Sequence, residues 1–319
     1  MQYVIPDTYD GRVLRDFLRT ELQLSRRLIT RLKQTPGGIL LCGRAVTVRA
    51  CLHASDVLTL ATEDAPDVQS SVVPNGAMPP ILYEDEHILL CNKPSHMPTH
   101  PSHGHFDDTL ANAVAAYQLT KEGRRAPFRP INRLDRQTSG VVLMAKDQHS
   151  AARLSEHMRD GHIQKTYLAI LAGVPDPSEG SIDAPIRRAE QSIITRAVCR
   201  ADEPGAHTAH TDYRVLSTWK NAAGDPRSPV LALPLTGRTH QLRVHFAHLG
   251  TPILGDRLYG LPSDESEQRH CLHALRLCFV HPASGRQMSV CAPLPDDMLA
   301  HLPEGIGPIP FLDSKEELS

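Results

Sequence analysis

The chain has 319 residues, of which 40% are hydrophobic and 22% charged, and its formal net charge is −2 at pH 7. This composition is typical of a soluble globular protein, and the length is sufficient for two domains. No apolar run approaches the roughly 20 residues that span a bilayer, and the first residues lack the pattern of a secretion signal, so we expect a cytoplasmic protein. The seven cysteines are scattered and odd in number, which argues against a disulfide framework or a zinc ribbon.

Residues 1–62 are predicted to form a small basic unit. Apolar side chains at helical spacing between residues 13 and 22 indicate one helix, and Ser25 is a plausible N-cap for a second. Short strands are expected over 39–41, 45–48 and 57–60. Nine basic and two acidic residues lie between positions 12 and 49, a balance that suits RNA docking, although a solvated charged face explains it equally well. The candidate RNA-binding residues are Arg26, Arg27, Arg31, Lys33 and Arg44.

The stretch 63–80 is rich in proline and polar residues and is interpreted as a linker. From 81 to 299, apolar runs of strand length alternate with segments of helical periodicity. Strands are expected over 88–91, 141–145, 167–171, 213–216, 230–233, 275–280 and 287–291. Helices are expected after Asp107 or Asp108, after Asp147, and from Leu242 to Gly250. The alternation predicts a mixed α/β or α+β domain, followed by an acidic tail over 300–319.

The most informative stretch is Asn132-Arg133-Leu134-Asp135-Arg136-Gln137-Thr138-Ser139-Gly140. Two arginines flank a carboxylate just before a turn that leads into an apolar strand. Guanidinium groups on both sides favour the charged carboxylate, and a position at a strand end allows it to face a cleft. Taken alone, an Arg-Leu-Asp-Arg string is explained by a structural ion pair. Other parts of the sequence are therefore needed to distinguish a structural from a catalytic carboxylate.

The string Arg-Leu-Asp-x-x-Thr-Ser-Gly, residues 133–140, closely resembles the catalytic motif of the RluA family of pseudouridine synthases. A second resemblance follows in the right order over 235–245, Leu-Thr-Gly-Arg-Thr-His-Gln-Leu-Arg-Val-His, and continues through 250–260. Lys93-Pro94 and Lys165-Thr166-Tyr167 match shorter motifs of the same family. Residues 1–62 resemble the S4 RNA-binding module, so the resemblance covers nearly the whole chain.

The resemblance implies the pseudouridine-synthase fold, an α+β domain with a mixed, largely antiparallel sheet flanked by helices, preceded by a small S4-like α/β module. It implies isomerisation of specific uridines in structured RNA, with ribosomal RNA favoured and transfer RNA next. The reaction breaks the N1–C1′ bond, rotates the uracil and rejoins it through C5, so nothing is oxidised and no cofactor is expected. We expect RNA as the partner and, because no interface signal stands out, a monomer.

The resemblance also implies roles for individual residues. Asp135 matches the carboxylate that engages the nucleoside, and the sequence leaves open whether it attacks C1′ or removes a proton from C2′. Arg238 matches the family's ion-pair partner of that carboxylate, with Arg133 as a second candidate, and Tyr167 matches the tyrosine that stacks on the extruded base. A structural role beside the site is the alternative for Arg238 and Tyr167. Further substrate-binding candidates are Arg133, Arg136, Lys165 and Thr138.

Asn132 departs from the pattern, because many family members have histidine immediately before Arg133. Asparagine forms hydrogen bonds but does not titrate, so we assign it no proton-transfer role.

Two other functions compete with the synthase. The run from His100 through His103 and His105 to Asp108 superficially resembles the ligand run of metallo-hydrolases, but it lacks a final histidine, and no second cluster has ligand spacing; we therefore predict no metal site. The histidines at 240, 245 and 248 are more typical of a helix face or a core. A non-catalytic RNA-binding protein that uses only its S4-like module is the second alternative, and the joint presence of Asp135, Tyr167 and Arg238 argues against it.

Overall fold

The computed structural model describes residues 2–22, 24, 26–61, 72–123, 126–190, 192, 194–261 and 269–303, with Arg27 described by its backbone alone. Several expectations therefore lie outside the described residues: the Ser25 N-cap, the side chain of Arg27, most of the linker and most of the acidic tail. The described part of the linker, 72–80, lies against the following domain, because the backbone N–H of Asn75 donates to the carbonyl of Asn112.

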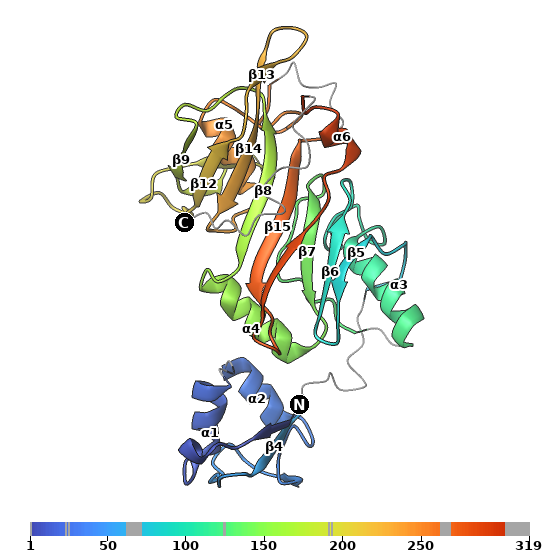
Figure 1. Cartoon of the computed structure of the whole chain (residues 1–319), viewed down its shortest axis with the longest axis vertical. Helices are drawn as coiled ribbons and strands as arrows, with labels where there is room; N and C mark the ends of the chain where they lie inside the picture. Colours follow the sequence, from blue (N-terminus) through green and yellow to red (C-terminus); the bar gives the residue numbers. More distant parts are fainter. Residues whose placement is uncertain are drawn as a thin grey trace.

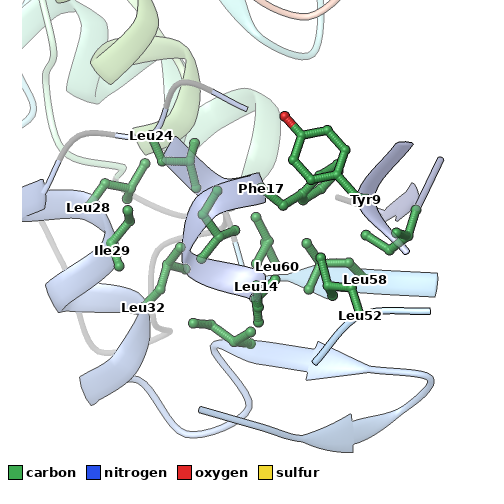
Figure 2. Close-up of a cluster of buried hydrophobic side chains, with 13 residues drawn as sticks. Tyr9, Leu14, Phe17, Leu24, Leu28, Ile29, Leu32, Leu52, Leu58 and Leu60 are labelled. Carbon is green, nitrogen blue, oxygen red and sulfur yellow. The ribbon is translucent and has the colours of Figure 1, made fainter. Parts of the chain in front are cut away.

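The N-terminal unit packs its helices against a four-stranded antiparallel sheet of order β1-β4-β2-β3 (Figures 1 and 2). Its strands are β1 (Gln2–Val4), β2 (Ile39–Leu41), β3 (Arg44–Ala45) and β4 (Val57–Leu60). Helix α1 (Leu14–Asp16) continues as a π-helical segment, η2 (Phe17–Glu21), and α2 covers Arg26–Gln34. Leucines of both helices and of β4 form one core, labelled in Figure 2. The helices were predicted correctly, whereas the strand expected over 45–48 is confirmed only at Ala45, because β3 ends there.

The larger domain is built on a ten-stranded mixed sheet with the main order β5-β6-β7-β15-β8-β14-β12-β9, while β13 pairs with β14 and β16 with β15. Every pairing is antiparallel except that of β7 with β15. The strands are β5 (Ile81–Glu84), β6 (Ile88–Lys93), β7 (Ser139–Ala145), β8 (Gln164–Leu171), β9 (Glu179–Asp183), β12 (His210–Val215), β13 (Trp219–Lys220), β14 (Pro226–Pro234), β15 (Leu272–Val280) and β16 (Gln287–Cys291). This largely antiparallel sheet confirms the expected fold class.

Helices flank the sheet (Figure 1): α3 (Leu110–Glu122), α4 (Gln148–Arg159), α5 (Gln241–His248) and the short α6 (Asp296–Leu299). Asp147 caps α4 as predicted, because its side chain accepts from the N–H of Ser150. The start expected for α3 at Asp107 or Asp108 was wrong. Thr109 is the N-cap and forms a capping box with Asn112. Helix α6, β9, β13 and the separate hairpin of β10 (Ile186–Arg188) and β11 (Arg196–Val198) were not anticipated, because short segments carry little periodicity.

The parallel pairing of β7 with β15 positions the Asp135 loop. Its register places Ser139 opposite His273 and Gly140 opposite Ala274. Gly140 has φ +118°, and a Cβ atom there would lie 2.2 Å from the carbonyl oxygen of Ala274, so only glycine fits. The Thr-Ser-Gly turn therefore fixes the preceding loop at the middle of the sheet. No helix in the described part of the chain is long and apolar enough to cross a membrane.

Candidate active site

A cavity of about 520 Å³ opens where the Asp135 loop, β8 and the start of α5 meet. Its lining contains every residue assigned to catalysis or substrate binding from the sequence: Arg133, Asp135, Arg136, Thr138, Lys165, Tyr167 and Arg238. These residues come from three separate segments, and the sheet order brings the segments together. The structure therefore places the motifs at one site, although it changes what several of the residues do there.

Asp135 is held by an arginine of α5. Its Oδ2 lies 3.3 Å from Nη1 of Arg243, whose side chain is only 6% exposed. The same guanidinium forms two further bonds with Asp256, from Nε to Oδ2 at 2.7 Å and from Nη2 to Oδ1 at 2.8 Å. Burial alone would lower the pKa of Arg243, but the two carboxylates outweigh it and raise that pKa. Arg243 is thus a fixed cation between a buried carboxylate and the cavity.

The prediction that Arg238 pairs with Asp135 was wrong. Arg238 is exposed at the rim of the cavity, and its Nε donates to the carbonyl of Thr208 at 2.8 Å. Arg243 takes the place assigned to it, five residues later in the same motif. The sequence contained an indication of this role. Arg243 lies between the apolar Leu242 and Val244 on a helix that packs into the core, and a buried arginine needs a buried partner for its charge.

Tyr167 faces the cavity from β8, between the strand neighbours Ala232 and Ala274. Its ring is half-buried and packs against two apolar clusters. Burial, with a second contribution from the charge of Asp135, raises the pKa of its hydroxyl. Tyr167 is therefore a neutral phenol at physiological pH, suited to stacking and to donating a hydrogen bond.

Lys165 and Thr138, both predicted to bind substrate, already have hydrogen-bond partners within the protein. Burial lowers the pKa of Lys165 to about 8, and its Nζ donates to the carbonyl of Thr236 at 3.1 Å. The hydroxyl of Thr138 is buried and lies 2.8 Å from Nε2 of His270. This contact favours a role for Thr138 in holding the loop over direct contact with substrate. Lys165 is half-buried and lines the cavity, so it remains a candidate for contact with substrate.

Two buried basic side chains hold the backbone that follows Asp135 in place. Lys93 is fully buried, and its Nζ donates to the carbonyls of Pro94 and Met97, both at 2.8 Å, and of Arg136 at 3.3 Å. Burial lowers the pKa of Lys93 to about 7, although the charge of Asp135 acts in the opposite direction. Arg269 donates to the carbonyl of Gln137. The sequence showed Lys93 only as a motif match, and nothing in it revealed Arg269.

Asn132 has a structural role. Its Nδ2 donates to the carbonyl of Val141 at 3.0 Å, and its Oδ1 accepts from the N–H of Leu143 at 2.8 Å. These bonds tie the start of the motif to β7.

His100 and His105 line the cavity, and each has a local partner. Nδ1 of His105 lies 2.6 Å from Oδ2 of Asp108, and the His100 ring meets Phe128 edge to face. Among the described residues, no group of three or more His, Cys, Asp or Glu side chains is placed to hold a metal ion. His245 is a buried core residue, as predicted, hydrogen-bonded to Thr211 and Ala184. His240 differs from that expectation, because it lines the cavity with Nε2 3.8 Å from Oδ2 of Asp135.

The basic residues of the N-terminal unit form a separate surface. Arg26, Arg31, Lys33 and Arg44 are all exposed, and none of them lines the cavity.

Comparisons with known proteins place these observations in context. The sequence model of the family described as RNA pseudouridylate synthase matches residues 87–248. The chain is 37% identical to an uncharacterized RNA pseudouridine synthase, YjbO, of Bacillus subtilis, over 87% of this chain and 94% of that protein. It is 37% identical to the ribosomal large subunit pseudouridine synthase D of Zymomonas mobilis, over 68% and 70%. The solved structure of human RNA pseudouridylate synthase domain containing 1 aligns with a TM-score of 0.56 at 32% identity, covering 68% of this chain and 83% of that one.

Proposed function

The chain belongs to the RNA pseudouridylate synthase family and is an RNA pseudouridine isomerase, and from this premise we propose that it isomerises uridines of ribosomal RNA through Asp135. The preference for ribosomal RNA is supported by relatives named ribosomal large subunit pseudouridine synthase D. Transfer RNA is the second candidate. The observation that carries the assignment of Asp135 is its ion pair with Arg243 inside the cavity.

The geometry of Asp135 favours one of its oxygens as the reactive atom. Among the described residues, the two side chains within ion-pair distance of its carboxylate, Arg243 and His240, both approach Oδ2. Oδ1 is therefore the oxygen available to the ribose of a bound uridine. It can attack C1′ and release the uracil, or remove a proton from C2′. In the first route the bond between Oδ1 and C1′ breaks as C5 of the rotated uracil bonds to C1′. In the second, loss of the C2′ proton expels the uracil, and Asp135 returns that proton to C2′ as C5 bonds to C1′. In both routes the carboxylate is regenerated, and C5 loses its proton as N1 gains one.

Tyr167 is proposed to stack on the flipped uracil. A base inside a helix or loop stack has to leave it to reach an enclosed carboxylate, and an aromatic face compensates part of the lost stacking. The neutral hydroxyl of Tyr167 lies near enough to Asp135 for the charge to affect its pKa. A phenol in this state donates a hydrogen bond and does not act as a base unaided.

The exposed arginines of the cavity are proposed to bind the phosphates that flank the target nucleotide. Arg133 and Arg136 come from the Asp135 loop and Arg238 from the segment before α5, so they approach the cavity from different segments. Nη1 of Arg136 lies 3.2 Å from Nε2 of His105, which orients it. Guanidinium groups suit phosphate oxygens in charge and in geometry. Lys165 adds an amine deeper in the cavity.

The N-terminal unit is proposed to be an S4-like anchor. Its exposed basic residues Arg26, Arg31, Lys33 and Arg44 would contact phosphates without reading sequence. The anchor would hold structured RNA while the cavity selects one uridine.

Tritium release from RNA labelled at uracil C5 tests the proposal, with wild type and Asp135→Asn compared on ribosomal and transfer RNA without added metal or cofactor. We expect release by the wild type, none by the variant, and equal RNA binding by both. Faster release from ribosomal RNA would support the substrate preference. Equal release by the two proteins would exclude Asp135 as the catalytic residue, and binding without release on any RNA would favour a non-catalytic RNA-binding protein.

A further inference from the structure

His240 adopts a backbone conformation that residues other than glycine rarely take. It precedes α5 with φ +58° and ψ +19°, in the left-handed region. This conformation is unfavourable for a residue with a Cβ atom, and Asn, Asp and His are the side chains that enter it most often. Strain of this kind persists where the surrounding structure enforces it, often at functional sites. Here it places the imidazole in the wall of the cavity, with 13% of the side chain exposed.

The hydrogen bonds of Tyr259 favour one tautomer of His240. The backbone N–H of Arg196 donates to the Tyr259 hydroxyl oxygen at 2.8 Å. That hydroxyl also lies 2.8 Å from Nδ1 of His240. Because the Arg196 N–H already occupies an acceptor position of this hydroxyl, a Tyr259 O–H that points at Nδ1 uses its donor as well. The neutral imidazole then carries its hydrogen on Nε2.

Nε2 of His240 faces the proposed catalytic carboxylate, 3.8 Å from Oδ2 of Asp135. Burial lowers the pKa of His240 and favours the neutral ring. Asp135 and Asp256 act to raise that pKa, whereas Arg243 and Arg196 act to lower it. The neutral tautomer therefore presents an N–H to the same oxygen that Arg243 binds.

We propose that His240 is a positioning residue, whose Nε2–H closes onto Oδ2 of Asp135 when uridine binds and leaves Oδ1 directed at the ribose. The inference rests on the proposed role of Asp135. The separation of 3.8 Å exceeds a hydrogen bond, and catalytic hydrogen bonds that are long in the free enzyme often shorten in the substrate complex. Tyr259 acts through His240 by fixing its tautomer.

A purely structural role for His240 makes the opposite prediction about substitutions. Asparagine tolerates the left-handed conformation well and its amide occupies the position of Nδ1, so it preserves the backbone and the contact with Tyr259. Glutamine fits that backbone less well, but its Nε2 reaches the position of the histidine Nε2. If the role of His240 is purely structural, His240→Asn should be both more stable and more active than His240→Gln. If His240 positions Asp135, His240→Asn should still be the more stable variant, but His240→Gln should be the more active one.

Single-turnover tritium release at varied RNA concentration, combined with thermal melting, separates the two roles. We expect His240→Asn to melt no lower than His240→Gln, and yet to lose about 10- to 100-fold in the maximal rate, with half-saturation changed less than about 2-fold. His240→Gln is expected to stay within about 5-fold of wild type. A wild-type rate for His240→Asn, or a slower rate for His240→Gln than for His240→Asn, would overturn the proposal.

A double-mutant cycle tests whether Tyr259 acts through His240. Tyr259→Phe keeps the ring over which Arg243 lies, 5.1 Å from its centroid, and removes only the hydroxyl. We expect it to slow wild type about 10-fold and to have no further effect in His240→Ala. Additive losses would contradict the coupling. Asp135→Asn is measured in the same experiment. If it releases tritium at the wild-type rate, the proposed function itself is wrong. If it is inactive and the His240 variants react at the wild-type rate, only the positioning role is refuted.

Discussion

Nη1 of Arg243 lies 3.3 Å from Oδ2 of Asp135, although 108 residues of sequence separate the two. Arg243 is in turn bound by two hydrogen bonds to the buried carboxylate of Asp256. The cation that orients Asp135 is therefore itself held by a second anion. Because a guanidinium fork fits a carboxylate in a fixed geometry, this arrangement limits how far Asp135 can rotate in the cavity.

The two arginines of the second motif are predicted to differ in kinetic effect. Arg243→Lys keeps a charge but loses the fork that joins Asp135 to Asp256, so we expect at least about a 100-fold loss in the maximal rate. Arg238→Lys keeps the rim charge and is expected to change half-saturation by RNA less than about 5-fold, with the maximal rate unchanged. Single-turnover rates against RNA concentration measure both. A larger rate loss for Arg238→Lys would restore the original assignment.

Asp256 is predicted to be a stability determinant. Asp256→Ala leaves the buried Arg243 without its main partner, and breaking a buried pair in this way costs about 3–5 kcal/mol. The control is Asp202→Ala, which removes an ion pair at the surface, where the side chains of Asp202 and Arg200 are 71% and 81% exposed. This variant is expected to lose less than about 1 kcal/mol of unfolding free energy. Urea unfolding of the two variants compares them. Equal, small losses would show that Arg243 finds another partner.

RNA affinity is predicted to depend on pH through Lys165. Burial lowers the pKa of this amine to about 8, so it is charged below that pH and neutral above it. Phosphate binding favours the charged form, and half-saturation should rise as the pH passes from 7 to 9. Lys165→Arg remains charged throughout, so its curve should be flatter. Parallel curves for the two proteins would exclude a contribution of the Lys165 charge.

Glu84 is predicted to stabilise the fold in a pH-dependent way. Burial alone would raise its pKa, but hydrogen bonds from Lys121, Tyr117 and Lys146 outweigh burial and lower the pKa to about 2. Since the folded-state pKa lies below the ordinary value of 4.5, the stabilisation is complete above pH 4.5 and is lost as the pH falls toward 2.

Glu84→Gln tests this by unfolding at a series of pH values. Because the Lys121 side chain is 48% exposed, solvent screening reduces the effect, and we expect a loss of only about 1–2 kcal/mol at pH 7. The difference from wild type should shrink toward zero near pH 2. A difference independent of pH would mean that the charge of Glu84 contributes nothing.

The N-terminal anchor is predicted to appear in the salt dependence of RNA binding. Removing two phosphate contacts with Arg31→Gln and Lys33→Gln should reduce the slope of log affinity against log salt by about 1–2 units. Arg159→Gln with Lys220→Gln, which removes two exposed charges from the other domain, is the matched control. The same slope for both double variants would argue against an anchor on α2.

Local sequence patterns determined much of the architecture. The alternating apolar runs predicted the central strands, and Asp147 marked the start of α4, because period and capping depend on a few neighbouring residues. The ordered motifs were sufficient to indicate the family and a site that contains Asp135, Tyr167 and Lys165. The short elements between them, β9 to β11 and α6, are too brief to carry a periodic signal.

The tertiary structure decided which side chains meet at the site. The sequence offers Arg238 and Arg243 in one motif, and only the position of α5 across the sheet shows that Arg243 reaches Asp135 while Arg238 stays at the rim. Lys93 contacts the carbonyl of Arg136 because β6 and β7 are neighbours in the sheet. The His240 ring reaches the cavity wall through a left-handed backbone conformation that only the structure shows. Such contacts join segments far apart in the chain, so they depend on strand order and helix placement, which no local pattern encodes.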